Sequence, residues 1–133
     1  MSRLLHWIPV LLWMGLIFWL SSQPQLPRLP EPLWQTLLAK TAHFGEYAVL
    51  AVLFLFALGG VSPGRAPNRR LLVLAAVLVY AISDEFHQGF VPNRTASLWD
   101  VLIDGAGALA ALRWMRAGRR YPWMIGGQAR GSS

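Results

Sequence analysis

The chain has 133 residues, of which 55% are hydrophobic and only 14% are charged. A soluble domain carries about 25% charged residues, so this composition excludes an ordinary water-soluble globule and indicates a single-domain membrane protein. The formal charge of +6 does not indicate nucleic acid as a partner, because the basic residues are segregated, and the lack of cysteine excludes disulfides and thiolate chemistry.

The first apolar run covers residues 4–20, with Arg3 before it and Ser21-Ser22-Gln23-Pro24 after it. Its length and bulky side chains predict a membrane-spanning helix. The alternative is a cleaved signal peptide with Arg3 as its basic region. We favour a retained span, because the run is long, rich in tryptophan and not followed by a small-residue cleavage motif.

The middle of the chain predicts two further spans. Residues 23–32 hold four prolines, which indicates an irregular loop, and residues 33–39 suit a short surface helix. The second span is expected over residues 41–58 and is ended by the glycine and proline turn signals of residues 59–64. The third begins at Leu71 and continues through polar residues toward Pro92.

The fourth span is predicted over residues 98–114, with a tryptophan at each end as an interfacial anchor. Residues 117–133 form a basic, glycine-rich tail that we expect to be poorly ordered. The sequence therefore predicts an all-α fold. We expect an integral membrane four-helix bundle over residues 1–116.

The basic residues predict the orientation of this bundle. Nine fall at the N-terminus, in the second-to-third loop or in the tail: Arg3, Arg65, Arg69, Arg70, Arg113, Arg116, Arg119, Arg120 and Arg130. The other side has three, which are Arg28, Lys40 and Arg94. Positive charge near span ends resists translocation, so both termini are expected in the cytoplasm.

The acidic residues all fall on the outer half of the predicted bundle. They are Glu31, Glu46, Asp84, Glu85, Asp100 and Asp104. Asp104 precedes Arg113 by nine positions, which places it roughly 13 to 14 Å above the inner boundary of a hydrocarbon core about 30 Å thick. Charged groups at such depth usually face a protein-lined or water-filled cavity, so we expect a polar pocket that opens outward.

Helical spacing places these polar residues on shared faces. Lys40, His43 and Tyr47 share one face of the second span with Glu46 beside it, Asp84 shares a face with His87 and Gln88, and Asp100 and Asp104 share one with Gly107 and Ala111. Small residues allow close helix packing in lipid, so the Asp100 and Asp104 face is expected to point inward.

Several kinds of chemistry fit this constellation. Lys40 and Arg94 suit a phosphate or carboxylate, and the carboxylates suit acid, base or metal-ligand roles. The His43-x-x-Glu46 spacing and the acidic cluster would allow a divalent metal. The alternative is an ion-pair network whose sole role is to fix helix register.

In combination these motifs resemble the VanZ-like family of small bacterial membrane proteins. The motifs are Ser21-Ser22-Gln23-Pro24, Lys40-x-x-His43-x-x-Glu46-Tyr47, Asp84-Glu85-x-His87-Gln88, Val91-Pro92-x-Arg94 and Ser97-x-x-Asp100-x-x-x-Asp104-x-x-Gly107. The family often has Gly where Asn93 stands and Asn where Asp104 stands. Asn at the second position would preserve hydrogen bonding but not acid/base chemistry.

The resemblance implies a cell-envelope protein of the bacterial cytoplasmic (inner) membrane, in a family linked to resistance against the glycopeptide teicoplanin. We expect it to bind or modify an anionic lipid-linked or lipoglycopeptide molecule. The acid/base candidates are Asp84, Glu85 and His43, and the binding candidates are Ser22, Lys40, Glu46, Tyr47, Gln88, Arg94, Asp100 and Asp104. The alternatives are a non-catalytic structural or accessory module and a proton-coupled flippase or transporter that works as an oligomer.

Overall fold

In a computed structural model of the chain, the structure describes residues 3–24, 33–59 and 66–117, and these contain helices but no strand. A short 3-10 helix, η1 (Arg3–Trp7), leads into α1 (Ile8–Ser21). The helices α2 (Leu33–Ala57), α3 (Ala66–Gln88) and α4 (Leu98–Ala117) follow. The predicted all-helical fold is confirmed, whereas most of the proline-rich loop and of the C-terminal tail lies outside the described residues.

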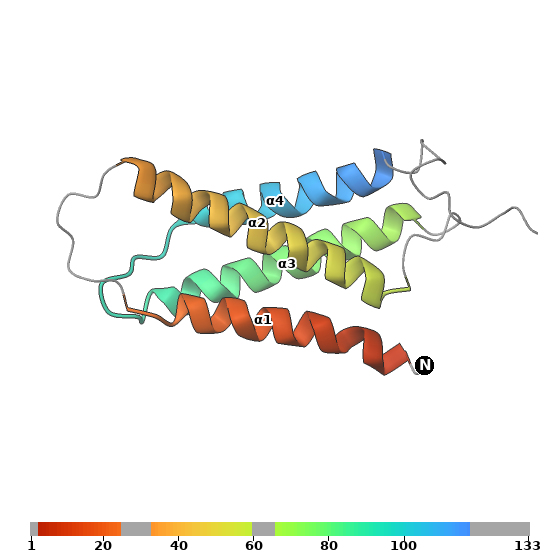
Figure 1. The fold of residues 1–133 in the computed structure, drawn as a ribbon, viewed down its shortest axis with the longest axis horizontal. Coiled ribbons are helices and arrows are strands. Elements are labelled where there is room, and N and C mark those ends of the chain that lie inside the picture. The colour runs from red at the N-terminus through yellow and green to blue at the C-terminus, as the bar shows by residue number, and fades with distance from the viewer. Residues whose placement is uncertain (1–2, 25–32, 60–65, 118–133) are drawn as a thin grey trace, which may run out of the picture.

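The four α-helices alternate in direction along a common long axis (Figure 1). The start of α1, the end of α2, the start of α3 and the end of α4 lie at one end of the molecule. Both α2 and α3 contact α1 and α4, while α1 and α4 do not touch each other within the described parts of the chain. The α2 and α3 helices therefore form the centre, and polar residues on their facing sides can meet residues from both outer helices.

Two predicted helix boundaries were wrong. Residues 33–39 are not a separate surface helix, because α2 runs without a break from Leu33 to Ala57. Lys40 interrupts the hydropathy of this segment but not its helical backbone, since lysine is a good helix former. Likewise α3 begins at Ala66 rather than Leu71, with Pro67 in its first turn, where no intrahelical N–H is needed.

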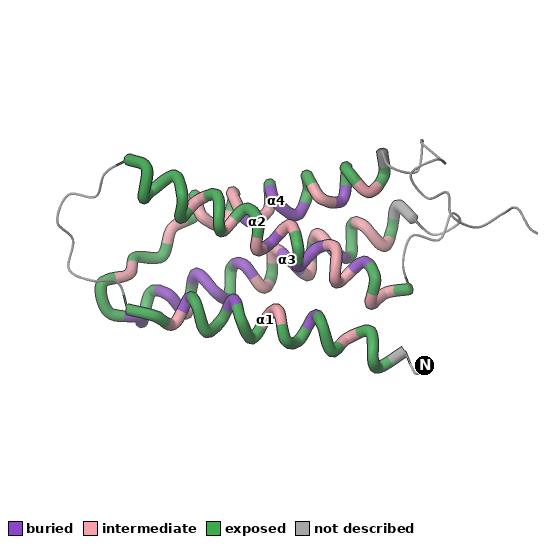
Figure 2. Tube along the Cα trace, viewed as in Figure 1, coloured by how far each residue is buried: buried purple, intermediate pink, exposed green. Residues whose placement is uncertain are grey.

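Buried residues form a narrow interior along the helices, and exposed residues cover a wide outer surface (Figure 2). The interior includes Ile17 on α1, Leu50 on α2, Val77 on α3 and Ala108 on α4. Large hydrophobic side chains cover the outside of every helix, among them Leu11, Phe18, Leu38, Phe56, Leu71, Val79, Leu102 and Trp114. Exposed apolar area this extensive would be unstable in water, so it is the surface expected of a protein that faces lipid.

Within the described residues, three helical segments are long and apolar enough to cross a membrane: Leu4–Ser21, Leu33–Ala57 and Asn68–Gln88. These agree with the first three predicted spans. The α4 helix is 20 residues long, but it contains two aspartates and two arginines, which lower its hydropathy. Its status as a fourth span therefore depends on how those charges are accommodated.

The α1 helix is attached to the centre by polar contacts from aromatic side chains. The Trp13 indole Nε1 donates to the main-chain oxygen of Glu46 over 2.9 Å, and the Tyr80 hydroxyl donates to the main-chain oxygen of Met14 over 2.6 Å. In a hydrocarbon environment such groups need internal partners, so these bonds hold α1 against both α2 and α3.

Candidate functional site

The buried polar side chains gather toward the end of the molecule where α1 and α3 finish and α4 begins. They are Ser21, Asp84, Glu85, Gln88 and Asp104, and each is at most 5% exposed. These five, counted among the residues that the structure describes, are costly to bury in so apolar a protein unless they are paired or bind something. Their contacts therefore indicate what the site can do.

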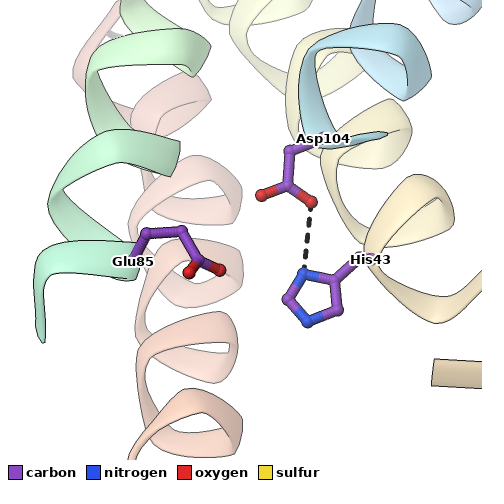
Figure 3. Close-up of side chains that lie close together, drawn as sticks. All are labelled: His43, Glu85 and Asp104. Atoms are coloured by element: carbon purple, nitrogen blue, oxygen red, sulfur yellow. Dashed lines mark hydrogen bonds and ion pairs between the residues drawn. The ribbon is translucent and has the colours of Figure 1, made fainter. Parts of the chain in front are cut away.

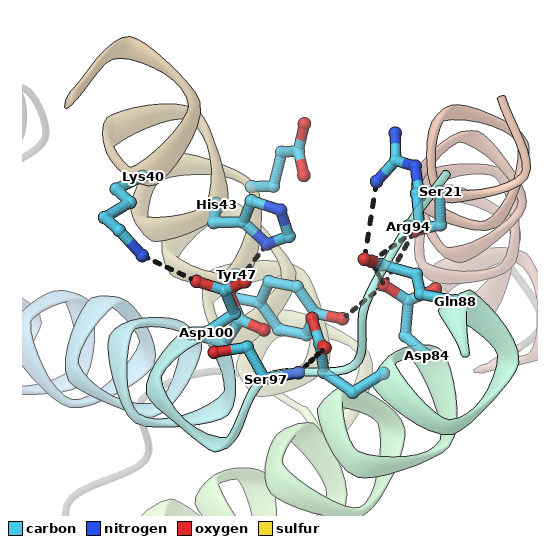
Figure 4. A network of polar contacts seen from close by, with 12 residues as sticks. Ser21, Lys40, His43, Tyr47, Asp84, Gln88, Arg94, Ser97 and Asp100 are labelled. Carbon is cyan, nitrogen blue, oxygen red and sulfur yellow. Dashed lines mark hydrogen bonds and ion pairs between the residues drawn. The ribbon is translucent and has the colours of Figure 1, made fainter. Parts of the chain in front are cut away.

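Asp84 is the centre of the first group of contacts (Figure 4). Its Oδ2 accepts hydrogen bonds from Ser21 Oγ at 2.7 Å, Gln88 Nε2 at 3.1 Å and Tyr47 OH at 3.4 Å. Gln88 lies one turn after Asp84 on α3, while Ser21 ends α1 and Tyr47 lies on α2. A single carboxylate oxygen thus joins three helices.

Arg94 lies in the loop before α4 and closes the open end of α1. Its Nε donates to the main-chain oxygen of Gln23 at 2.9 Å, and its Nη2 donates to that of Leu20 at 3.3 Å. Its Nη1 donates to Gln88 Oε1 at 3.3 Å. The Leu20 oxygen also accepts the main-chain N–H of Gln23 at 3.2 Å, so Arg94 adds a second donor there and a donor to the Gln23 oxygen. Arg94 therefore supports the C-terminal end of α1 and connects it to the Asp84 group.

The loop conformation that presents Arg94 depends on the residue before it. Asn93 has a φ of 62°, in the left-handed region that glycine adopts without strain and asparagine tolerates better than most residues. The departure from the glycine of the resembled family is therefore compatible with the same turn.

A second group of contacts links α2 to α4. Lys40 Nζ lies 2.9 Å from Asp100 Oδ1, and His43 Nδ1 lies 3.2 Å from Asp104 Oδ1. Their exposure falls with depth: the Lys40 side chain is 41% exposed and that of Asp104 is 1% exposed. The expected inward face of α4 is confirmed. The Lys40–Asp100 pair is the more exposed of the two ion pairs, and the His43–Asp104 pair is the more buried.

Gly107 permits the close approach of α4 that the inner pair needs. It lies one turn after Asp104, and a Cβ there would collide with the carbonyl group of Phe44, the residue after His43. The absence of a side chain lets the two backbones meet next to the pair, which is the role of small residues in membrane helix packing.

Glu85 links α3 to the segment just before α4. Its Oε2 accepts a hydrogen bond from the main-chain N–H of Ser97 at 2.8 Å, just before α4 begins. The Glu85 side chain therefore faces the start of α4, and its residue is 4% exposed. The neighbouring residues Asp84 and Glu85 therefore have different partners. Asp84 contacts side chains of α1 and α2, and Glu85 contacts the segment just before α4.

One oxygen of each buried carboxylate is left over. Asp84 Oδ1, Glu85 Oε1 and Asp104 Oδ2 are buried and have no hydrogen-bond partner within the part of the chain that the structure describes. Buried polar atoms in native proteins are normally satisfied, so three unsatisfied carboxylate oxygens in one region require an explanation. They offer acceptor positions to a proton, a cation or a ligand that carries donors.

Three residues of the site are placed like metal ligands. His43, Glu85 and Asp104 come from α2, α3 and α4, and one potential ligand atom from each lies within 4.8 Å of the others (Figure 3). The sequence pointed to the His43-x-x-Glu46 spacing together with the acidic cluster for such a site. The structure brings Glu85 and Asp104 of that cluster to His43, whereas Glu46 is not in the group of possible ligands found among the described residues.

Most residues predicted for the site are brought together, with a few differences. Ser22 turns back to the main-chain oxygen of Phe18 over 2.6 Å, and its neighbour Ser21 is the serine that reaches Asp84. The main-chain N–H of Ser97 also belongs to the site. Ser21 and Ser22 are adjacent and chemically identical, so the sequence alone does not show which of the two reaches Asp84.

Comparison with known proteins gives one positive result. The family model VanZ/LLP1 matches residues 6–116, which include every helix described above except the first residues of η1 and the last residue of α4. No curated protein and no solved structure matches the chain.

Proposed function

The chain belongs to the VanZ/LLP1 family, and from this premise we propose that it is a four-helix bundle of the bacterial inner membrane that binds an anionic lipid-linked envelope molecule. The polar site would receive the headgroup from the outer leaflet. In this proposal the protein contributes to glycopeptide resistance of the teicoplanin type, by binding or modifying that molecule.

The proposal requires α4 to be the fourth span with both termini in the cytoplasm. Its two aspartates are paired to Lys40 and His43, and its two arginines lie near its last turn, where long side chains can reach the headgroup region. The arginines then lie on the same side as the start of α3, as the distribution of positive charge favours.

The observation that supports a binding role is the set of three unsatisfied buried oxygens. A network that only fixed helix register would be expected to pair every buried carboxylate oxygen, because each unpaired one is destabilising. Asp84, Glu85 and Asp104 each have one carboxylate oxygen without a hydrogen-bond partner among the described residues. This pattern favours a site whose remaining partner is a ligand.

The cationic side chains also keep donor capacity for an anionic group. The Lys40 ammonium has three N–H donors, and the ion pair with Asp100 uses one of them. The Arg94 guanidinium has five, and its contacts described above use three. Both lie at the more exposed side of the site, so we assign them to the anionic group of the ligand.

The remaining polar residues take roles that follow from their positions. Asp84 and Glu85 would serve as acid or base if the bound molecule is modified, with His43 as the third candidate. The other binding candidates hold these groups in place: Tyr47 and Gln88 through Asp84, and Asp100 and Asp104 through the basic side chains of α2.

A binding measurement tests the proposal with a polyprenyl phosphate as probe and the neutral polyprenol of equal chain length as control. We expect the purified protein to retain the phosphate and not the alcohol. Lys40→Gln should weaken retention about tenfold, since it removes one charge-assisted hydrogen bond. Ser83→Ala is the matched control, because Ser83 is exposed and bonds only to the main-chain oxygen of Tyr80 among its described contacts.

The same variants can be tested in cells by measuring growth at increasing teicoplanin concentration. Cells with Glu85→Gln should be as sensitive as cells without the protein, at equal protein level, and cells with Ser83→Ala should resemble wild type. Equal retention of polyprenyl phosphate and polyprenol, or unchanged sensitivity with Glu85→Gln, would contradict the proposed function.

A further inference from the structure

We propose that His43, Glu85 and Asp104 bind a first-row divalent metal ion, of the Zn²⁺ or Mn²⁺ kind, inside the membrane. The three side chains come from three helices and present their ligand atoms within 4.8 Å of one another (Figure 3). The ion would be a resident group of the protein. The inference therefore stands apart from which molecule the site binds.

The first argument is the direction of the unsatisfied atoms. Glu85 is 4% exposed and Asp104 is fully buried, and each has one carboxylate oxygen without a partner in the described part of the chain. In Figure 3 both carboxylates are directed toward the space beside the His43 ring. The oxygens that lack partners thus belong to the two carboxylates that gather at the histidine.

The second argument is charge. Glu85 and Asp104, when ionised, bring two negative charges into a region that excludes water, and each costs several kcal/mol to bury unpaired. Asp104 contacts His43, whose ring carries a charge only when it is doubly protonated, and no ion pair is found for Glu85 within the part of the chain that the structure describes. Lys40 pairs with Asp100, and Arg94 bonds to two main-chain oxygens and an amide. A divalent cation beside a neutral imidazole would balance both carboxylates. Protons on the carboxyls are the competing solution.

The third argument is spacing. Two ligands bound about 2.1 Å from one metal lie about 3.0 Å apart at an octahedral angle and about 3.4 Å apart at a tetrahedral one. The His43 Nδ1 to Asp104 Oδ1 distance of 3.2 Å falls between these values. The Glu85 side chain has three rotatable bonds, so it can close the remaining distance without movement of a helix.

The ligand set selects the class of metal. Imidazole suits Zn²⁺ and other first-row ions, whereas Mg²⁺ and Ca²⁺ prefer sites made of oxygen ligands alone. Three protein ligands leave at least one coordination position for water or another oxygen ligand. A phosphate oxygen at that position would lie in the same site as Lys40 and Arg94.

Metal analysis of the purified protein tests this inference directly. Protein prepared without chelator and equilibrated with Zn²⁺ or Mn²⁺ should retain about one ion per chain after gel filtration. Glu85→Gln and Asp104→Asn keep the side-chain shapes and should each lower retention at least tenfold. His87→Gln is the matched control, since His87 is a potential metal ligand on the same helix as Glu85 but outside the ligand set, and it should retain the ion.

A second measurement protects the test against a variant that fails to fold. Co²⁺ added to the metal-free wild-type protein should produce the visible absorption of a nitrogen- and oxygen-ligated site and raise the midpoint of thermal unfolding. Wild-type protein that retains no ion and gives no Co²⁺ spectrum would overturn the inference. Equal ion loss in His87→Gln and Glu85→Gln would overturn it as well. Either result would leave the binding of polyprenyl phosphate untouched.

Discussion

Replacement of Gly107 by alanine should separate α4 from α2 and destabilise the protein. The new Cβ would meet the carbonyl group of Phe44, with the carbonyl carbon 3.0 Å away and the oxygen closer still. Ordinary contacts between carbon and oxygen begin at about 3.3 Å, so α4 must move outward by on the order of 1 Å. The obstructing atoms are main-chain atoms of a central helix and cannot turn aside.

The expected size of this effect follows from the neighbouring contacts. Overpacking typically costs about 1 to 3 kcal/mol, and the upper part of this range applies where backbone blocks backbone. An outward shift would also lengthen the 3.2 Å contact between His43 and Asp104 beyond hydrogen-bond range. Such a bond between membrane helices contributes about 0.6 to 1.7 kcal/mol. We therefore expect the free energy of unfolding to fall by about 3 kcal/mol.

The assay is reversible unfolding in mixed micelles of increasing sodium dodecyl sulfate content, followed by circular dichroism. Gly45→Ala is the matched control, because Gly45 lies on α2 next to Phe44 and a Cβ there meets nothing within 4 Å. That variant should differ from wild type by at most about 1 kcal/mol, toward higher stability. If Gly107→Ala stays within about 0.5 kcal/mol of wild type, the described contact of α2 with α4 is incorrect.

Three further predictions concern single contacts and orientation. Tyr80→Phe removes the hydroxyl that bonds to Met14 and should lower the free energy of unfolding by about 1 kcal/mol in the same assay, and no change would contradict that bond. Lys40→Gln should change it by less than about 1 kcal/mol, because the ion pair is partly exposed; a larger loss would assign Lys40 a mainly structural role. Because the chain has no cysteine, Thr95→Cys and Asn68→Cys each introduce a single site for labelling. A membrane-impermeant maleimide should label Thr95→Cys in intact cells and Asn68→Cys only after lysis. The reverse pattern would refute the proposed topology.

Hydropathy predicted the positions of the helices correctly but placed the first residues of α2 and α3 wrongly. The first three spans were predicted because long apolar runs ended in proline or glycine signals, such as Gly59, whose φ of 92° ends α2. The break before Thr41 was wrong because hydropathy registers the charge of Lys40, while the backbone follows its helix propensity. A charged residue with a partner on another helix can lie within a span, and a single sequence does not reveal that partner.

The sequence predicted which site residues share a helix face, but it did not predict which residues pair across helices. Spacing placed Asp100 and Asp104 on one inward stripe of α4, as the structure confirms. It could not say that Lys40 meets Asp100, or that Glu85 and Asp104 join His43 in one group of possible ligands, because those contacts depend on the relative height and rotation of separate helices. The use of Arg94 to close the end of α1 follows from a loop conformation, which periodicity does not address.

The central claim is that the buried carboxylates around His43 form a ligand site and not a lock that holds the helices in register. The most direct test is the stability of Glu85→Gln in chelator-treated, lipid-free micelles. The amide keeps an oxygen for the Ser97 N–H but removes a buried charge for which no ion pair is found among the described residues. We predict that its free energy of unfolding equals or exceeds that of wild type while growth in teicoplanin is lost. A fall of more than about 1.5 kcal/mol would contradict the claim, since breaking a structural pair by removing one partner is strongly destabilising.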